Sequence, residues 1–411
     1  MMFINDDYRE VGNDYLEFVD TINKMVNRTE VLRLPKSLIK TWTIMSEDDK
    51  FFYLAQNGYS TPTFLPGDSA VRQPVPSIKP FAKKKFFDRG MNQALLDEIS
   101  RSKTFFVMDS KATLFEGEGL WNTLGQRIGL TGKNISEPSF ARNEHVQERL
   151  DVQTEKPEVY TIVLREQNGV KKWFAAHSDS YPYVPQTILC DIAEKFIAAN
   201  YGGLGEAKCA EWEVNHHYST VKLLFPEKAK DIQATYGLPD AIVPGLILTT
   251  SDLGENSITC KGIFSVRGSY VVQKEVKKQH KGDVKPDSVV ATIDREVFSE
   301  YTKLPARLCE LMTIDIADVK YSLDEAFKGL GIRKFGEKTT EKLTEALMME
   351  LPAGGSYTAY DLSIAILSLQ GRLSDIPVYT KNTLEEKCIK APFLKWEQFA
   401  GLSDGDVVVT A

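Results

Sequence analysis

The alternation of apolar and polar residues is clearest in the middle of the chain, where it predicts two paired strands. Residues 159–165 are rich in β-branched residues, with Tyr160, Ile162 and Leu164 on one face, and residues 170–177 form a second strand-like run. The two runs are separated by Gln167 and the dipeptide Asn168-Gly169. Asn-Gly favours a tight hairpin turn because both residues accept positive φ. The pattern therefore predicts a β-hairpin that turns at Asn168-Gly169.

Apolar periodicity after the hairpin predicts further strands between two helices. Helices are recognised by apolar residues three and four positions apart, and strands by alternation. In chain order, the predicted elements are a helix over 188–199, strands over 211–225, 245–251 and 257–273, and a helix over 289–301. The longest strand is expected to bend at Gly262 or Gly268, since glycine in a strand often marks a bend. Strands grouped in this way predict an α+β fold with one central antiparallel sheet.

Helical spacing dominates both ends of the chain. Apolar residues from Tyr15 to Met25 recur at helical spacing, and the same spacing predicts helices over 338–351 and 357–373. The last helix has Ser356 and Thr358 as candidate N-caps. The predicted organisation is a helical N-terminal region (1–58), a proline-rich and basic arm (59–90), an α+β sheet core (91–303) and a helical C-terminal region (304–411).

Positive charge is concentrated in two stretches, although the whole chain carries a net charge of −7. Prolines 62, 66, 74, 76 and 80 predict an extended segment, because proline removes a backbone donor and blocks regular structure. Residues 72–89 hold six basic residues and one acidic residue, and 256–285 hold seven basic residues and two acidic ones. Local patches of this kind bind phosphates even on an acidic protein. A solvated surface that serves only solubility would carry the same charges.

Composition narrows the class of protein. The chain has 411 residues, of which 42% are apolar and 26% charged, as in ordinary globular proteins. It contains no apolar run long enough to cross a membrane and no leader-like start, so we expect no membrane span and no secretory signal. The five cysteines are odd in number and widely spaced, which predicts buried free thiols in a reducing cytoplasm rather than disulfides or zinc sites.

Motifs for catalysis and cofactor binding are missing from the sequence. It has neither a P-loop nor a GxSxG nucleophile elbow. The glycines at 202–205 follow a predicted helix, whereas a dinucleotide-binding loop should follow a strand. His216 and His217 lie near Cys209, but adjacent strand residues point to opposite faces. We therefore expect no cofactor and no zinc. The acidic residues that remain as candidate ligands for a divalent ion are Asp179, Asp191, Glu194, Asp252 and Glu255.

Cations and an aromatic residue gather on the predicted sheet. The candidate nucleic-acid-binding residues are Arg165, Lys171, Lys172 and Trp173 on the hairpin, and Lys222, Lys261, Arg267, Lys274, Lys277 and Lys278 on or directly after the later strands. Cations that follow a nucleic-acid backbone, with aromatic rings nearby, form a recognised surface for single strands. A plain exposed sheet face would also carry lysines.

The middle of the chain resembles a family of phage/plasmid-like proteins of unknown function, which bacterial phages and mobile elements encode. The resemblance rests on the hairpin over 160–177, the segments 178–181 and 250–254, and Ser257. It covers about residues 120–310. Many members carry a Cys-x-Asn-Gly-type segment after the last long strand, and this chain has Arg267-Gly268-Ser269 there instead.

The order hairpin, helix, three strands, helix is also similar to the core of the single-strand annealing proteins of the RecT and Red-beta class. Those proteins bind single-stranded DNA in a basic groove beside the sheet, assemble into rings or filaments and need no nucleotide cofactor. The resemblance implies a homo-oligomeric protein that binds and anneals single-stranded DNA, without a chemical step, in the cytoplasm of a bacterial host.

Two other functions stay open on the sequence. One is a structural or assembly protein of a phage, in which the segment 59–80 reaches a neighbouring subunit. The other is a metal-dependent enzyme that acts on nucleic acid or nucleotides through Asp179 and Asp252.

Overall fold

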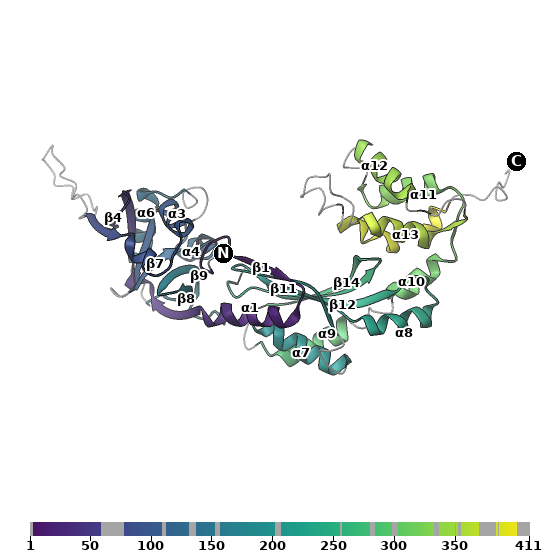
Figure 1. The fold of residues 1–411 in the computed structure, drawn as a ribbon, viewed down its shortest axis with the longest axis horizontal. Coiled ribbons are helices and arrows are strands. Elements are labelled where there is room, and N and C mark those ends of the chain that lie inside the picture. The colour runs from purple at the N-terminus through teal and green to yellow at the C-terminus, as the bar shows by residue number, and fades with distance from the viewer. Residues whose placement is uncertain are drawn as a thin grey trace.

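The protein has an α+β fold, as the sequence predicts, built from two large sheets and a C-terminal group of helices. The computed structural model describes residues 3–58, 78–108, 112–130, 137–152, 157–201, 207–254, 257–279, 284–297, 303–332, 337–349, 351, 355–369, 384 and 386–400. The two sheets and the C-terminal helices follow one another along an elongated molecule (Figure 1). Within these ranges, no helix is long and apolar enough to cross a bilayer.

The first sheet has eight strands in the order β2-β8-β9-β7-β6-β3-β4-β5, and all neighbours are antiparallel except β7 and β9. The strands are β2 (Thr29–Pro35), β3 (Ile39–Glu47), β4 (Phe51–Gln56), β5 (Ile78–Ala82), β6 (Thr104–Met108), β7 (Ala112–Glu116), β8 (Val159–Gln167) and β9 (Val170–Ser178). The helices in this part are η1 (Lys36–Leu38), α2 (Lys84–Phe87), α3 (Gln93–Ser102), α4 (Leu120–Ile128) and α6 (Phe140–Asp151). Apolar residues of α4 and α6 pack against β6, β8 and β9 in one core, which includes the buried Trp173.

The predicted hairpin is confirmed as β8 and β9. Its turn lies at Asn168 and Gly169, which have φ angles of 51° and 75°. Gln167 pairs with Val170 at the end of the ladder. Both turn residues therefore use the positive φ that makes Asn-Gly a hairpin signal.

The second sheet has six antiparallel strands in the order β1-β10-β11-β12-β13-β14. The strands are β1 (Arg9–Gly12), β10 (Lys208–Asn215), β11 (Ser219–Leu224), β12 (Ile242–Thr250), β13 (Ile258–Val266) and β14 (Ser269–Lys278). The helices α1 (Tyr15–Asn27), α7 (Ile188–Tyr201), α8 (Pro226–Tyr236) and α9 (Pro286–Glu296) lie along one face (Figure 1). Alternate apolar residues of the strands, such as Val221, Leu248 and Cys260, form a core with these helices.

The prediction of one central sheet is wrong, because the hairpin and the later strands belong to different sheets. The structure also has five strands where the sequence predicts three. The stretch 211–225 divides between Asn215 and Ser219. The stretch 257–273 has an irregularity in its register at Gly262 and Ile263 and turns back fully at Arg267-Gly268. Arg267 and Gly268 have φ angles of 48° and 82°. Arginine rarely adopts positive φ, so this dipeptide is a weak turn signal in a sequence.

The helical description of residues 1–58 needs a similar correction. It holds for α1, but β1, β2, β3 and β4 account for most of the rest. The predicted extended arm over 59–90 can be compared with the structure only at residues 78–90, where it is wrong. Residues 59–77 lie outside the described residues, whereas 78–90 contain β5 and α2. Pro80 is tolerated in β5 because that strand is at the edge of its sheet.

The C-terminal part is helical, as its periodicity predicts. It comprises α10 (Lys303–Leu311), α11 (Val319–Gly329), α12 (Glu337–Met348), α13 (Ala359–Ser368), η6 (Ala391–Phe393), η7 (Trp396–Gln398) and the short pair β15 (Asp315–Ile316) and β16 (Tyr357–Thr358). Thr358 caps α13 in a capping box with Asp361. Asp240 joins this part to the second sheet, because its carboxylate accepts from Tyr360 Oη at 2.7 Å and from Arg267 Nε at 2.9 Å.

Candidate nucleic-acid interface

Three of the four hairpin residues predicted to bind nucleic acid are buried. Arg165, Lys172 and Trp173 each have 0% of their surface exposed. Arg165 Nη2 lies 2.8 Å from Asp252 Oδ1, and Lys172 Nζ donates to both Asp6 and Glu98 at 2.7 Å. The prediction that these side chains contact phosphates or bases is therefore wrong. They are desolvated and already paired, because β8 and β9 are covered on both faces.

Lys171, the fourth hairpin residue, is half-buried between carboxylates. Its ammonium forms ion pairs with Glu30 and, at 3.4 Å, with Glu166. A cation that already faces two carboxylates releases few counterions when it meets a phosphate. The strand alternation on which the site was predicted is thus a poor guide here. The run of apolar residues from Trp173 to Ala176 is the signal of burial on both faces.

The second sheet brings three of the predicted lysines to the face opposite α1, α7, α8 and α9. Register places Lys222, Ile247, Lys261 and Glu275 side by side on four neighbouring strands, with Lys277 in the next row. Lys222 pairs with Glu211 and lies 3.7 Å from the centroid of the Tyr270 ring. Lys277 pairs with Glu275 at 3.1 Å. This face therefore carries both signs of charge and is not strongly positive.

The other predicted strand residues do not join this row. Lys278 is exposed at the end of β14 and pairs in register with Ile258, whose side chain is buried. Arg267 lies at the β13–β14 turn, where its bond to Asp240 raises the pKa of the guanidinium. Lys274 pairs with Gly262 in β14, and its side chain lies outside the described part of the structure.

A stronger concentration of positive charge lies on residues 78–90, which we call the basic segment. Four of its cations are exposed: Lys79, Lys84, Lys85 and Arg89. Within the part of the chain that the structure describes, none of the four has a carboxylate partner. Lys83 is the exception in the segment, because its ammonium lies 2.6 Å from Glu47. Most of the charge on this surface is therefore available to a ligand.

Aromatic residues anchor the basic segment and also contribute to its surface. Phe86 of α2 is buried, and its ring is tilted against those of Phe81 and Phe115, with ring centroids 5.7 and 5.3 Å away. The next residue, Phe87, is 48% exposed. Lys85 lies over the Phe81 ring, with Nζ 5.5 Å from its centroid. Exposed cations and an exposed phenyl ring therefore share one small helix.

The turn of the β8–β9 hairpin holds the end of the basic segment. Arg89 Nη1 donates to the carbonyl of Gly169 at 3.0 Å, and Asn168 Nδ2 donates to the carbonyl of Arg89 at 3.0 Å. The hairpin thus contributes to this surface through its turn and not through Lys171, Lys172 or Trp173. The sequence shows the basic stretch 72–89 but does not place it beside the turn, because contacts between distant segments are not visible in local patterns.

The carboxylates proposed for metal chemistry do not form a site. Asp252 is fully buried and accepts from Arg165, Gln186 (2.9 Å) and Tyr183 (3.2 Å). Asp179 is exposed and pairs with Arg33 at 2.7 Å. Among the residues that the structure describes, no group of three or more His, Cys, Asp or Glu residues is arranged to hold a metal ion. Glu255 lies outside the described ranges. The two aspartates on which the metal-dependent hypothesis rests are therefore separately paired.

The histidines and cysteines near the second sheet are structural. His216 is buried, and its Nε2 lies 2.9 Å from the carbonyl oxygen of Asn5. Burial, together with the charge of Arg165, lowers the pKa of His216 well below its usual value. The five cysteines are free, as predicted, and four of them are buried. Burial raises the pKa of Cys190 to about 12 and that of Cys209 to about 11, so both remain protonated thiols at neutral pH.

Comparisons with family models, with curated proteins and with solved structures find no match for this chain. The interpretation of the basic segment therefore rests on its own geometry and charge.

Proposed function

We propose that the protein binds single-stranded nucleic acid through the basic segment. The observation that supports this proposal is a set of four exposed cations that form no ion pair with any described carboxylate: Lys79, Lys84, Lys85 and Arg89. Affinity for a nucleic-acid backbone comes mainly from lysine and arginine side chains that replace counterions at the phosphates. Cations that are not already neutralised by the protein contribute most to that exchange.

The exposed Phe87 ring favours a single strand over a duplex. Bases of a single strand stack on aromatic side chains, whereas the bases of a duplex are already stacked on one another. Phe87 lies between Lys85 and Arg89 in the sequence and is about half exposed. A strand whose phosphates contact these cations is therefore within reach of a ring on which a base can stack.

We further propose that binding serves the annealing of complementary strands, in a protein of phage or mobile-element type that performs no chemical step. This part of the proposal rests on the similarity between the predicted element order and that of single-strand annealing proteins. The hairpin β8–β9 is followed by α7, by five strands that α8 interrupts, and by α9, although the hairpin and the strands belong to different sheets.

Binding is tested by fluorescence anisotropy of a labelled oligothymidine about 30 nucleotides long, at about 50 mM salt. The triple variant Lys79→Glu, Lys84→Glu, Lys85→Glu should bind at least about tenfold more weakly and with a shallower dependence on salt, because fewer counterions are released. The matched control reverses three exposed lysines elsewhere, Lys208, Lys230 and Lys320, and should bind nearly as well as the wild type. Wild-type protein that does not bind, or a basic-segment variant that binds normally, contradicts the proposal.

Annealing requires a separate measurement. Two complementary oligonucleotides, one with a fluorophore and one with a quencher, should anneal faster in the presence of the wild-type protein than in its absence. The basic-segment variant should lose this acceleration. If the protein binds oligonucleotides but does not accelerate their annealing, the proposed nucleic-acid interface stands and the proposed annealing function is contradicted.

A further inference from the structure

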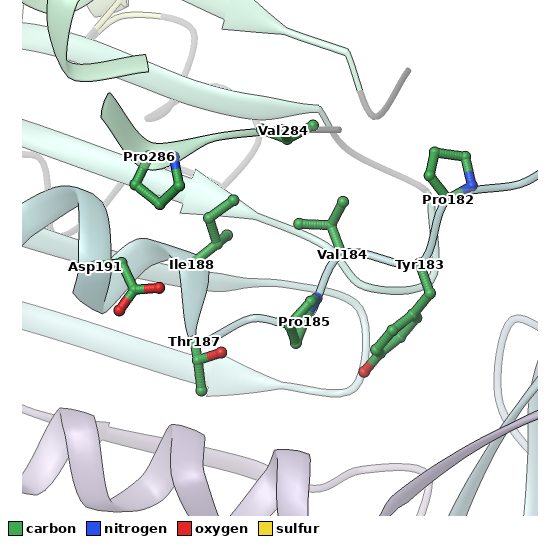
Figure 2. Close-up of a pocket in the computed structure, with 9 residues that line it drawn as sticks. All are labelled: Pro182, Tyr183, Val184, Pro185, Thr187, Ile188, Asp191, Val284 and Pro286. Atoms are coloured by element: carbon green, nitrogen blue, oxygen red, sulfur yellow. The ribbon is translucent and has the colours of Figure 1, made fainter. Parts of the chain in front are cut away.

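A groove lies where the chain enters α7, on the helix-covered side of the second sheet. It is about 420 Å³ in volume. Its lining residues are Pro182, Tyr183, Val184, Pro185, Thr187, Ile188, Asp191, Val284 and Pro286. Figure 2 shows Val284 and Pro286 on one side of the groove and Val184, Pro185 and Ile188 on the other. Most of the lining residues are therefore apolar, and several are prolines, whose ring restricts the backbone.

The groove carries an exposed carboxylate at one end. Asp191 lies in the first turn of α7 and is exposed, and Figure 2 shows it at the end of the groove opposite Pro182. The nearby Lys195 pairs with Asp287 at 2.5 Å. In the described part of the chain no cation forms an ion pair with Asp191. Apolar walls with an exposed anion at one end fit a ligand that combines apolar groups with a positive charge.

The chain itself contains such a sequence, in a connection that is longer than its ends require. β4 and β5 are antiparallel neighbours in which Ala55 pairs with Ile78. Strands in this arrangement are usually joined by loops of about two to five residues. Here the connection runs from residue 57 to residue 77, and it includes Val71-Arg72-Gln73-Pro74-Val75-Pro76. Connections of this length are usually functional segments or linkers.

We propose that residues 71–76 of one copy of the protein bind in this groove on a second copy. Arg72 would pair with Asp191, and Pro74, Val75 and Pro76 would contact the apolar walls. The contact joins different copies because both ends of the connection are anchored at β4 and β5, at the end of the first sheet that lies away from α7 (Figure 1). A contact between two different surfaces builds rings or open chains of subunits.

The proposal is tested by exchanging the two charges, with sedimentation velocity of the full-length protein in the absence of nucleic acid. Wild-type protein should associate as its concentration rises. Arg72→Glu and Asp191→Arg should each lose this association, because like charges then meet in the groove. An equimolar mixture of the two variants should associate again, since each type of segment finds a groove of opposite charge on the other variant. Association that neither variant changes, or no association of the wild type at about 100 μM, overturns the proposal.

A peptide measurement separates the groove from other contacts. A fluorescent peptide with the sequence of residues 69–77 should bind the full-length protein, and Asp191→Arg should weaken that binding at least about fivefold. Glu194→Arg is the matched control, because Glu194 is an exposed carboxylate on the same helix that does not line the groove. Equal binding by all three proteins overturns the proposal. Asp191→Arg should not change the affinity of isolated subunits for an oligonucleotide. Failure of the proposed contact between copies is therefore distinguishable from failure of the nucleic-acid interface.

Discussion

Arg165 of the first sheet and Asp252 of the second form an ion pair of 2.8 Å in which neither side chain is exposed. Arg165 also donates to Thr29 Oγ1 and to the carbonyl of His216. The Asp252 carboxylate also accepts hydrogen bonds from Gln186 and Tyr183. The pair therefore connects the hairpin strand β8 to the end of β12, across the junction of the two sheets.

Removing one charge of this pair should destabilise the protein strongly. Asp252→Asn leaves the Arg165 guanidinium buried without a counterion, and we expect a loss of about 3–5 kcal/mol in the free energy of unfolding. Urea denaturation measures this loss. The control is Asp179→Asn, which removes an exposed partner of Arg33 and should cost less than about 1 kcal/mol. Equal effects of the two substitutions would contradict a structural role for the buried pair.

Lys172 is expected to be structural rather than a contact for nucleic acid. Lys172→Met leaves the carboxylates of Asp6 and Glu98 without their shared cation, which should cost about 3–5 kcal/mol. Lys171→Met, at the half-exposed neighbour, should cost less than about 1 kcal/mol. Urea denaturation distinguishes the two. A Lys172→Met protein that is stable but binds oligonucleotides more weakly would show that Lys172 contacts nucleic acid.

The stability of the protein should fall in mild acid because of His216. The pKa of this residue is well below 6.5 in the folded protein because of burial, then Arg165, whereas the unfolded chain takes up a proton near pH 6.5. Its contribution to stability is therefore complete above about pH 7 and decreases as pH falls below 6.5, by up to about 1.4 kcal/mol per pH unit. The His216→Phe variant should lose this dependence when unfolding is measured between pH 7.5 and 5.5. His145→Gln, at an exposed histidine, should retain it.

The cysteines should differ sharply in their reactivity. Cys190, Cys209, Cys260 and Cys388 are buried, whereas Cys309 is partly exposed. A thiol reagent such as DTNB should therefore modify Cys309 first in the native protein, and the others only after denaturation, because the thiolate is the reactive form and burial opposes it. Rapid modification of four or five thiols in the native state would contradict the burial of these side chains.

Local patterns predict the hairpin, α1 and the helical C-terminal part, because turn chemistry and periodicity are local properties. They do not predict that the hairpin and the later strands separate into two sheets, since that depends on pairing between distant segments. They also misplace the interface. A lysine on a strand, such as Lys172, does not by itself show whether its face is open to solvent or covered by another layer; the apolar run that follows it, from Trp173 to Ala176, is the sign of burial. Lys84 and Lys85 are part of a visible basic run, but their contact with the hairpin turn depends on tertiary structure.

Strand β1 pairs with β10, so that Arg9 faces Asn215 and Gly12 faces Trp212. During synthesis the partner strand emerges about 200 residues after β1. At a translation rate of roughly 5–20 residues per second, β1 is synthesised at least about 10 s before the strand with which it pairs. The second sheet therefore cannot close as its strands appear, whereas the β8–β9 hairpin can form at once. A chaperone that shields residues 3–12 during this interval should raise the yield of folded protein, and a fusion at the N-terminus should affect folding more than one at the C-terminus.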